Sequence, residues 1–521
     1  MAKPKSRRTW YQNAVLYQIY PRSFQDSNGD GVGDLNGIRQ RLGYLDSLGV
    51  DAIWLSPMYT SPMKDFGYDI SDYCDVDPTF GTLEDFDNMV AEAHKLGIRV
   101  MTDLVPNHTS DQHPWFLESK QSKDNPKSDW YIWRDAKPDG SPPNNWLSVF
   151  TGSVWEWCVE RQQYYLHSFM TEQPDLNWEN PEVRKAMADV MRFWLDRGVD
   201  GFRVDAIDLM GKDLSFADEK VNRHHTGSKM DYSAVLHELS RDAGNFFNHL
   251  NFIADVAAKY DDKLIVWESY IIERHKPELY WHFYKQIDKP FCLPFNFELL
   301  FMDWSAQEIQ RFVDPFQAGL RKQDVPVYVL GNHDQQRFVT KVGPAEARAG
   351  AVLLMTLPGI SLIYNGEEIG MHDVDVPSNR PHPDTRDKCR TPMQWSAGPH
   401  AGFSTAEPWL PLADDYELAN TEYQQEDPDS MLNLYKNLIA MHHANPALNS
   451  GNYTPGPKIK NVVSFFRSTK KQSLLVLVNT SGSDVNTKLT GYKLLLSSYA
   501  ARQDFNGQLQ PHEGVILTKD A

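Results

Sequence analysis

Short apolar runs recur along the chain, and they alternate with segments in which apolar residues repeat every three or four positions. Most of these runs are too apolar for a strand with one face in water, which is typical of a parallel sheet buried on both faces. We expect eight strands, at residues 14–20, 52–56, 98–104, 201–206, 264–268, 292–297, 327–331 and 361–364.

The segments between these runs carry signals for helix starts and stops. Thr82 is a good N-cap with Asp85 three residues later, and Gly97 ends the apolar stripe that follows. Asn180 and Gly198 bracket a second segment of the same design, with a proline in its first turn. Eight strands that alternate with helices predict an α/β protein with a (β/α)8, or TIM, barrel. An open, doubly wound sheet is the alternative.

Two regions break the alternation. About seventy residues separate the third strand from the next clear helix, and they are rich in Trp, Tyr, Pro, Asn and Asp. Long connections in compact folds are usually functional or form a subdomain, so we expect residues 109–177 to form an inserted subdomain B over the strands' C-terminal ends. Short strands with polar turns in residues 448–521 predict a C-terminal antiparallel β-sandwich, which leaves residues 1–108 and 178–447 for the barrel.

Composition narrows the class of ligand. The 521 residues include 52 Lys and Arg against 70 Asp and Glu, and the net charge of −18 argues against nucleic acid and anionic membranes as partners. Four scattered cysteines without a CxxC pair argue against a zinc site and predict free thiols in a reducing compartment. No apolar segment follows the basic N-terminus, and no run of about 18 apolar residues occurs, so we expect a cytoplasmic protein.

An oxygen-rich loop, FQDSNGDGVGDLNG, follows the first predicted strand. Oxygens that could face one ion stand at alternate positions: Asp26, Asn28, Asp30, the Val32 carbonyl and Asp34. A short loop surrounds a hard cation in this way. Gly37 stands where an EF-hand sensor carries its bidentate Glu, so the pattern favours a structural metal site over a sensor, with an unmetallated acidic turn as the alternative.

Polar side chains gather where the predicted strands end, and in a barrel of this type the chemistry lies at those ends. They are Asp103, Asn107, His108, Arg203, Asp205, Glu268, Asn332, His333 and Asp334. Each alone is as readily structural as functional. The group carries more weight, because three carboxylates at the mouth of one barrel converge on one cleft.

Two close carboxylates are what glycoside hydrolysis needs, one as a proton donor and the other as a nucleophile or a base. Arg203 lies two residues before Asp205, so both side chains point to the same side of the strand. We expect the guanidinium to keep this carboxylate ionised, as a nucleophile requires. Glu268 follows Trp267 in an apolar run, and a partly desolvated Glu is a plausible general acid.

These motifs resemble the signature regions of the α-amylase family, glycoside hydrolase family 13. DLVPNH, GFRVDAID, VWES and GNHDQQR look like its four main regions. QPDLNW resembles a fifth region of the α-glucosidase and oligo-1,6-glucosidase branch, and LYQIYPRSF, DFGYDISDY, DQHPWF and RTPMQW are similar to that branch as well. The likeness follows the family's order along nearly the whole chain.

The resemblance implies a role for each matching residue. Asp205 matches the nucleophile, Glu268 the acid/base, and Asp334 the third carboxylate, which binds sugar hydroxyls. Arg203 matches the arginine that positions the nucleophile. The positions that surround the terminal glucosyl unit, subsite −1, are matched by Asp65, Tyr68, His108, His333 and Arg390. Asp65, Tyr68 and Arg390 are typical of exo-acting members, whose pocket is closed at one end.

The oxygen-rich loop is similar to the metal loop of these α-glucosidases, which implies one structural Ca²⁺ or Mg²⁺ on Asp26, Asn28, Asp30, Val32 and Asp34. No organic cofactor is implied. The partner implied is a small α-glucoside, and the chain is expected as a monomer or a small homo-oligomer.

The resemblance implies a retaining, exo-acting α-glucosidase with possible transglycosylation. Oligo-1,6-glucosidase, trehalose-6-phosphate hydrolase and sucrose- or trehalose-isomerising enzymes share nearly the same pocket and remain alternatives. Ala206 follows the nucleophile where Ala or Thr tends to accompany α-1,4 cleavage and Val α-1,6 cleavage, so the sequence favours maltose-type substrates. The non-enzymatic heavy chains of amino-acid transporters share this fold, but they carry a membrane span that this sequence lacks.

Overall fold

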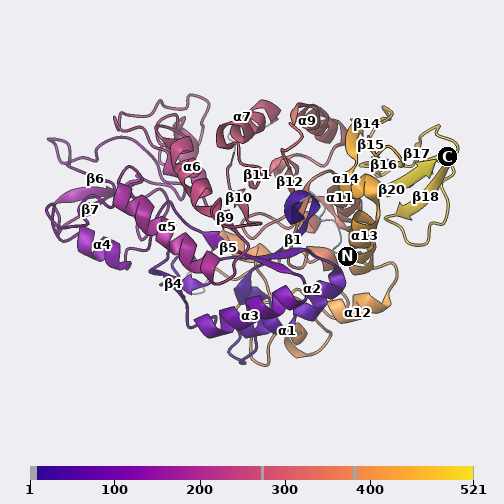
Figure 1. Ribbon diagram of the computed structural model, residues 1–521, viewed down its shortest axis with the longest axis horizontal. Coiled ribbons are helices and arrows are strands. Elements are labelled where there is room, and N and C mark those ends of the chain that lie inside the picture. The colour runs from indigo at the N-terminus through magenta and orange to yellow at the C-terminus, as the bar shows by residue number, and fades with distance from the viewer. Residues whose placement is uncertain (1–8, 271–274, 379–383, 520–521) are drawn as a thin grey trace, which may run out of the picture.

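A computed structural model describes residues 9–270, 275–378 and 384–519. At its centre eight parallel strands form a closed barrel in the order β1-β13-β12-β11-β10-β9-β5-β2 (Figure 1). They are β1 (Val15–Ile19), β2 (Ala52–Leu55), β5 (Arg99–Leu104), β9 (Gly201–Val204), β10 (Leu264–Trp267), β11 (Cys292–Asn296), β12 (Val327–Val329) and β13 (Ile360–Tyr364). The closed order confirms the predicted barrel and excludes the open sheet.

Alternate residues of each strand belong to two separate apolar clusters. In β10, Leu264 and Val266 lie in one cluster, and Ile265 and Trp267 lie in the other, which also contains the buried faces of the surrounding helices. The strands are therefore apolar on both faces because one face fills the barrel and the other packs on helices.

Helices surround the barrel in Figure 1 and return the chain between parallel strands. The helices are α1 (Leu35–Gln40), α2 (Leu42–Leu48), α3 (Leu83–Lys95), α4 (Pro114–Ser119), α5 (Pro181–Asp196), α6 (Phe246–Ala257), α7 (Pro277–Ile287), α8 (Glu298–Phe301), α9 (Ala306–Gly319), α10 (Phe338–Val342), α11 (Pro344–Thr356), α12 (Thr421–Glu426), α13 (Met431–Ala444) and α14 (Pro446–Ser450). The predicted caps are present: Thr82 and Asp85 form a capping box, and the Asn180 side chain accepts a hydrogen bond from the Glu182 amide. No helix among the described residues is both long and apolar enough to span a membrane.

The long connection between β5 and α5 forms a small sheet of its own, in the order β6-β8-β7. Its strands are β6 (Trp133–Arg134), β7 (Trp155–Cys158) and β8 (Gln163–Leu166), and a separate hairpin between β2 and α3 holds β3 (Tyr59–Thr60) and β4 (Asp72–Val76). The apolar cluster under this sheet includes Trp146 and also Phe216, whose ring stacks on Trp146 at 5.3 Å. Phe216 belongs to the connection after β9, so two long connections meet above the strand ends.

The C-terminal segment forms an antiparallel five-stranded sheet, in the order β14-β15-β16-β20-β18, with a two-stranded sheet of β17 and β19. The strands are β14 (Asn452–Pro455), β15 (Val462–Ser468), β16 (Ser473–Asn479), β17 (Val485–Asn486), β18 (Tyr492–Ser497), β19 (Gln508–Leu509) and β20 (Gly514–Lys519). Leu509 of the small sheet packs with Leu475 and Leu517 of the large one, as in a sandwich. Figure 1 shows this part at the opposite end of the molecule from β6 and β7.

Candidate active site

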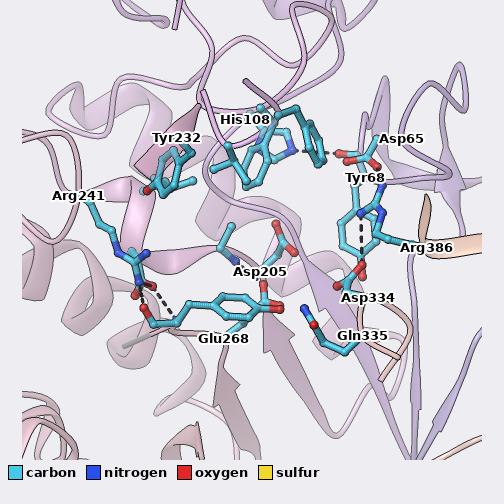
Figure 2. A pocket seen from close by; sticks show the side chains of 17 residues that line it. Asp65, Tyr68, His108, Asp205, Tyr232, Arg241, Glu268, Asp334, Gln335 and Arg386 are labelled. Atoms are coloured by element: carbon cyan, nitrogen blue, oxygen red, sulfur yellow. Dashed lines mark hydrogen bonds and ion pairs between the residues drawn. The ribbon is translucent and has the colours of Figure 1, made fainter. Parts of the chain in front are cut away.

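A cavity of about 350 Å³ lies at the C-terminal ends of the barrel strands (Figure 2). Three of the residues that line it are the predicted carboxylates Asp205, Glu268 and Asp334. The full lining is Asp65, Tyr68, His108, Val149, Phe150, Phe169, Asp205, Ala206, Asp208, Leu209, Tyr232, Arg241, Glu268, Tyr270, Asp334, Gln335 and Arg386. The strand-end carboxylates therefore meet in one cavity, as the sequence predicts.

The barrel strands place an arginine between three acids. Arg203 alternates with residues of the outer cluster and is the register partner of Asp103 in β5, so both side chains point into the barrel. Arg203 is 2% exposed, and its guanidinium lies 2.7 Å from Asp103, 2.7 Å from Asp205 and 2.5 Å from Glu268. One arginine thus fixes both members of the predicted catalytic pair.

Two of these acids, Asp205 and Asp103, have raised pKa values. Burial, together with the negative charges of Glu268, Asp103 and Asp334, raises the pKa of Asp205 well above its usual range, although Arg203 lowers it. Burial likewise raises the pKa of Asp103 to about 7, again against Arg203. Arg203 therefore acts on Asp205 in the predicted direction, whereas burial and the neighbouring buried carboxylates oppose it.

The chain turns sharply after the predicted nucleophile. Ala206 has φ 44° and ψ 40°, a left-handed conformation that residues with a side chain seldom adopt. The turn directs the Ala206 amide to Glu268 Oε2, to which it donates a hydrogen bond of 2.9 Å. Arg203 binds Asp205 Oδ1, and no hydrogen bond to Asp205 Oδ2 is found among the described residues. Oδ2 is therefore the oxygen left for a substrate.

On one side of the cavity the third carboxylate is held by two arginines. Asp334 Oδ1 lies 2.9 Å from Arg390 and 3.2 Å from Arg386, and Arg386 also binds Asp65 at 2.6 Å. Burial raises the pKa of Asp334, but His333, Arg386 and Arg390 lower it by more, to well below its usual range. Asp334 is therefore ionised at every working pH.

Two histidines on this side are neutral. Burial lowers the pKa of His333 to about 3, and burial lowers the pKa of His108 from its usual value. His333 is fully buried between Gln18, at 2.7 Å from Nδ1, and the Tyr68 hydroxyl, at 2.7 Å from Nε2. His108 lines the cavity itself. Neutral rings can exchange hydrogen bonds with sugar hydroxyls without adding charge.

The sequence-predicted residues fall into two groups. Those that line the cavity are Asp65, Tyr68, His108, Asp205, Ala206, Glu268 and Asp334. Arg203, His333 and Arg390 lie behind this wall and hold it in place through the contacts above. Sequence reasoning missed Arg386, which pairs with Asp65, although it lies only four residues before Arg390 in the same motif-rich stretch.

Sequence reasoning also missed the residues on the opposite side of the cavity, where Figure 2 shows Tyr232 and Arg241 across from Arg386. Both come from the connection after β9, which carries no repeating apolar pattern to place it. Arg241 pairs with Asp208 and donates to the Tyr270 carbonyl. Its charge is thus already neutralised by the protein.

The oxygen-rich loop after β1 offers the donor chemistry of a hard-cation site. Burial raises the pKa of Asp26, but hydrogen bonds from Ser404 and from loop amides lower it below its usual value, so this carboxylate is ionised. Asp34 accepts from the Gly37 amide at the start of α1, and Asp30 accepts from the Val32 amide. The set is all oxygen and fits Ca²⁺ or Mg²⁺ in chemistry. Its carboxylates do not gather around one point, whereas His372, Asp414 and Asp415 do so elsewhere in the described chain.

A (β/α)8 barrel that collects a buried carboxylate pair, a third carboxylate and a neutral histidine in one cavity is the arrangement of a glycoside hydrolase. Residues 18–451 match the family described as Alpha amylase, catalytic domain. The chain therefore belongs to the alpha-amylase family, as the sequence motifs indicated.

Relatives and solved structures agree with this assignment. The chain is 41% identical over 505 residues to a probable alpha-glucosidase of Rhizobium meliloti (strain 1021), covering 92% of this chain and 91% of that one. It is 38% identical to an oligo-1,6-glucosidase of Heyndrickxia coagulans, covering 94% and 96%. The crystal structure of an alpha-glucosyl transfer enzyme, XgtA, matches with a TM-score of 0.91 and 38% identity, covering 98% of this chain and all of that one.

Proposed function

We propose that this protein is a retaining, exo-acting α-glucosidase that removes the non-reducing terminal glucosyl unit of short α-glucosides. The observation that carries the proposal is the ion pair between Arg386 and the buried Asp65, beside Asp334, which walls one side of the cavity with mutually paired groups. A terminal glucose fits against such a wall, whereas the middle of a chain would need an exit there.

In this proposal each of the three carboxylates has a different role. Asp205 attacks the anomeric carbon through Oδ2, while Glu268, which the Ala206 amide orients, protonates the leaving oxygen. Glu268 then takes a proton from the water that releases the glucose. Asp334, ionised and held by two arginines, accepts hydrogen bonds from ring hydroxyls.

The leaving group is proposed to be a neutral sugar. The described cations of the cavity wall are Arg241 and Arg386, and each is already paired with carboxylates. A phosphate would need an unpaired, fixed cation. This favours maltose-type substrates over trehalose-6-phosphate.

The linkage preference is proposed to be α-1,4 over α-1,6, with oligo-1,6-glucosidase activity as the alternative. Ala206 lines the cavity beside Asp205, so the size of this side chain limits where the leaving sugar lies. Interception of the glucosyl-enzyme by a sugar hydroxyl would give transglycosylation as a side reaction.

One Ca²⁺ or Mg²⁺ is proposed on Asp26, Asn28, Asp30, the Val32 carbonyl and Asp34, where it would hold the first connection of the barrel in place without entering the chemistry. A cytoplasmic location is proposed because all four cysteines are free thiols, three of them buried. A monomer or small homo-oligomer is proposed for the assembly.

Glucose release from maltose, isomaltose, sucrose, trehalose and trehalose-6-phosphate tests the substrate, and proton NMR of the first product tests retention. We expect maltose to give the highest kcat/KM and α-glucose to appear first. Initial release of β-glucose, or hydrolysis of internal bonds in a long maltooligosaccharide blocked at its non-reducing end, would overturn the proposal.

A further inference from the structure

Lys212, which the mechanism above does not use, lies buried beneath the active-site wall. It is 6% exposed, and its Nζ lies 2.8 Å from Asp175 Oδ2 and 3.3 Å from Asn107 Oδ1. It also donates to the Leu209 carbonyl. These partners come from both ends of the connection between β5 and α5 and from the connection after β9. A buried ammonium with three oxygen partners is fully satisfied, so its position is fixed.

The ammonium determines how the Asn107 side chain points. An ammonium can only donate hydrogen bonds, so Asn107 must present its oxygen to Lys212 and its NH₂ group to the other side. There, Nδ2 lies 3.2 Å from Asp175 Oδ1, an acceptor, and 3.2 Å from Nδ1 of His108. The NH₂ group has one hydrogen for each. His108 Nδ1 must then accept, which places the single proton of the neutral ring on Nε2.

A second amide competes for this ring. Gln173 Nε2 lies 3.1 Å from His108 Nε2, and a bond there would require the opposite tautomer. Gln173 Nε2 also donates to Asp65 Oδ2 at 3.0 Å with its other hydrogen, and the Tyr68 carbonyl lies 3.2 Å from His108 Nε2, where it can accept. A proton on Nε2 satisfies both Asn107 and the Tyr68 carbonyl and leaves one hydrogen of Gln173 without the ring as its acceptor. A proton on Nδ1 would satisfy Gln173 alone and would face the Asn107 NH₂ group.

We propose that Lys212 is a positioning residue that fixes the tautomer of His108 through Asn107, so that the ring presents an N–H to the cavity. The ring must be neutral for this to hold, in agreement with the lowering of the His108 pKa by burial. The Nε2–H, which lies 3.2 Å from the Tyr68 carbonyl, is then shared with a sugar hydroxyl, while Asp334 accepts from another hydroxyl. That His108 meets the terminal glucosyl unit rests on the proposed function, whereas the tautomer itself does not.

The tautomer can be read from ¹⁵N shifts of protein labelled at histidine, with His108 assigned by its loss in His108→Gln. We expect the wild type to show a protonated Nε2 and an unprotonated Nδ1. Asn107→Asp is nearly isosteric and keeps a partner for Lys212, but it places a second acceptor at Nδ1 and should move the proton there. Lys212→Met should release Asn107 and give a mixture of tautomers.

Kinetics provide the second readout. Both variants should lower kcat/KM about 10-fold or more on maltose and p-nitrophenyl α-glucoside alike, because His108 lies on the side that both substrates share. Lys220→Met is the matched control, since Lys220 pairs with Glu238 on the surface of the same connection. It should leave tautomer and kcat/KM unchanged.

Several outcomes would overturn the proposal. One is a wild-type His108 protonated on Nδ1, and another is an Asn107→Asp protein whose His108 keeps its proton on Nε2. A Lys212→Met protein that loses thermal stability but keeps the wild-type tautomer and kcat/KM would show that Lys212 is merely structural. A confirmed tautomer in an enzyme inactive on α-glucosides would refute the proposed function and leave this inference standing.

Discussion

At the scale of single residues, Asp205 and Glu268 share Arg203 but differ in their other partners, and this difference separates the expected effects of changing them. Asp205→Asn removes the attacking oxygen and should reduce turnover of every substrate to background, with an unchanged circular dichroism spectrum.

Glu268→Gln should reduce kcat on maltose by about 10²–10⁴-fold, but much less on aryl glucosides, whose leaving groups need little protonation. Steady-state kinetics on both substrates provide the measurement. A Glu268→Gln enzyme that hydrolyses maltose at the wild-type rate would exclude Glu268 as the acid.

Ala206 tests the origin of linkage preference. Ala206→Val adds two methyl groups at the cavity wall and should shift the maltose-to-isomaltose ratio of kcat/KM toward isomaltose by about 10-fold or more. Because φ is 44° here, the β-branched residue should also cost roughly 1–2 kcal/mol of stability, whereas Ala206→Gly should relieve strain. The ratio of kcat/KM and the urea midpoint of both variants check this. An unchanged ratio would assign linkage to the connections after β5 and β10 instead.

The sequence identified the residues that lie at strand ends but not their protonation. Asp205, Glu268 and Asp334 were predictable because a parallel barrel brings its strand ends together. The raised pKa of Asp205 was not, because it depends on how many carboxylates share Arg203, which only the register of β5, β9 and β10 determines. Arg386 was missed for a similar reason, since no local pattern distinguishes it from its neighbour Arg390.

At the scale of elements, the loop between β1 and α1 is the place to test the metal. Chelation by EDTA should lower Tm by several degrees while the initial rate at 25 °C stays within about twofold, because an ion there joins Asp26 to the N-cap of α1 and not to the substrate. Differential scanning calorimetry and a rate assay of the same sample measure both. Asp30→Asn, a change confined to this loop, should reduce the effect of EDTA on Tm. Immediate loss of turnover with an unchanged Tm would argue for a catalytic ion instead.

The predictability of the elements followed the strength of their local signals. The strands and the helices α3 and α5 were predictable because their periodic patterns, caps and stops agree. The connection between β9 and α6 was not, because residues 211–245 hold only a short 3-10 turn at Tyr232–Ala234, and their position depends on distant partners such as Trp146. This connection supplies Tyr232 and Arg241 to the cavity, so the segment that was hardest to predict forms one side of the active site.

At the scale of the whole molecule, a buried acid couples stability to pH. Glu367 follows the last barrel strand and accepts a hydrogen bond of 2.8 Å from Tyr435 of α13, the final barrel helix. Burial and the neighbouring Glu368 raise its pKa to about 8, against Tyr435 and Arg337. The folded protein therefore holds this proton up to about pH 8, whereas the unfolded chain releases it near its usual pKa of 4.5. Its contribution to stability is complete below about pH 4.5 and is lost as the pH rises toward 8.

Glu367→Gln should remove this pH dependence, because the amide is neutral at every pH. Relative to wild type, we expect the variant to gain about 3–4 kcal/mol of stability between pH 5 and pH 8. Urea unfolding at both pH values measures the difference, and Glu346→Gln, a partly exposed acid at the start of α11, serves as the control. Equal effects of Glu367→Gln at both pH values would contradict the raised pKa.

The walled side of the cavity has a consequence for how this enzyme would meet long substrates. If a polysaccharide chain can enter only by its non-reducing end, the rate of hydrolysis depends on the number of non-reducing ends per unit mass and not on the mass itself. A highly branched polymer would then be degraded faster than a linear one of equal weight. Each glucose must also leave through the opening by which the next chain enters, so the enzyme would release its substrate after every hydrolysis. Free glucose would then compete with non-reducing ends for the cavity.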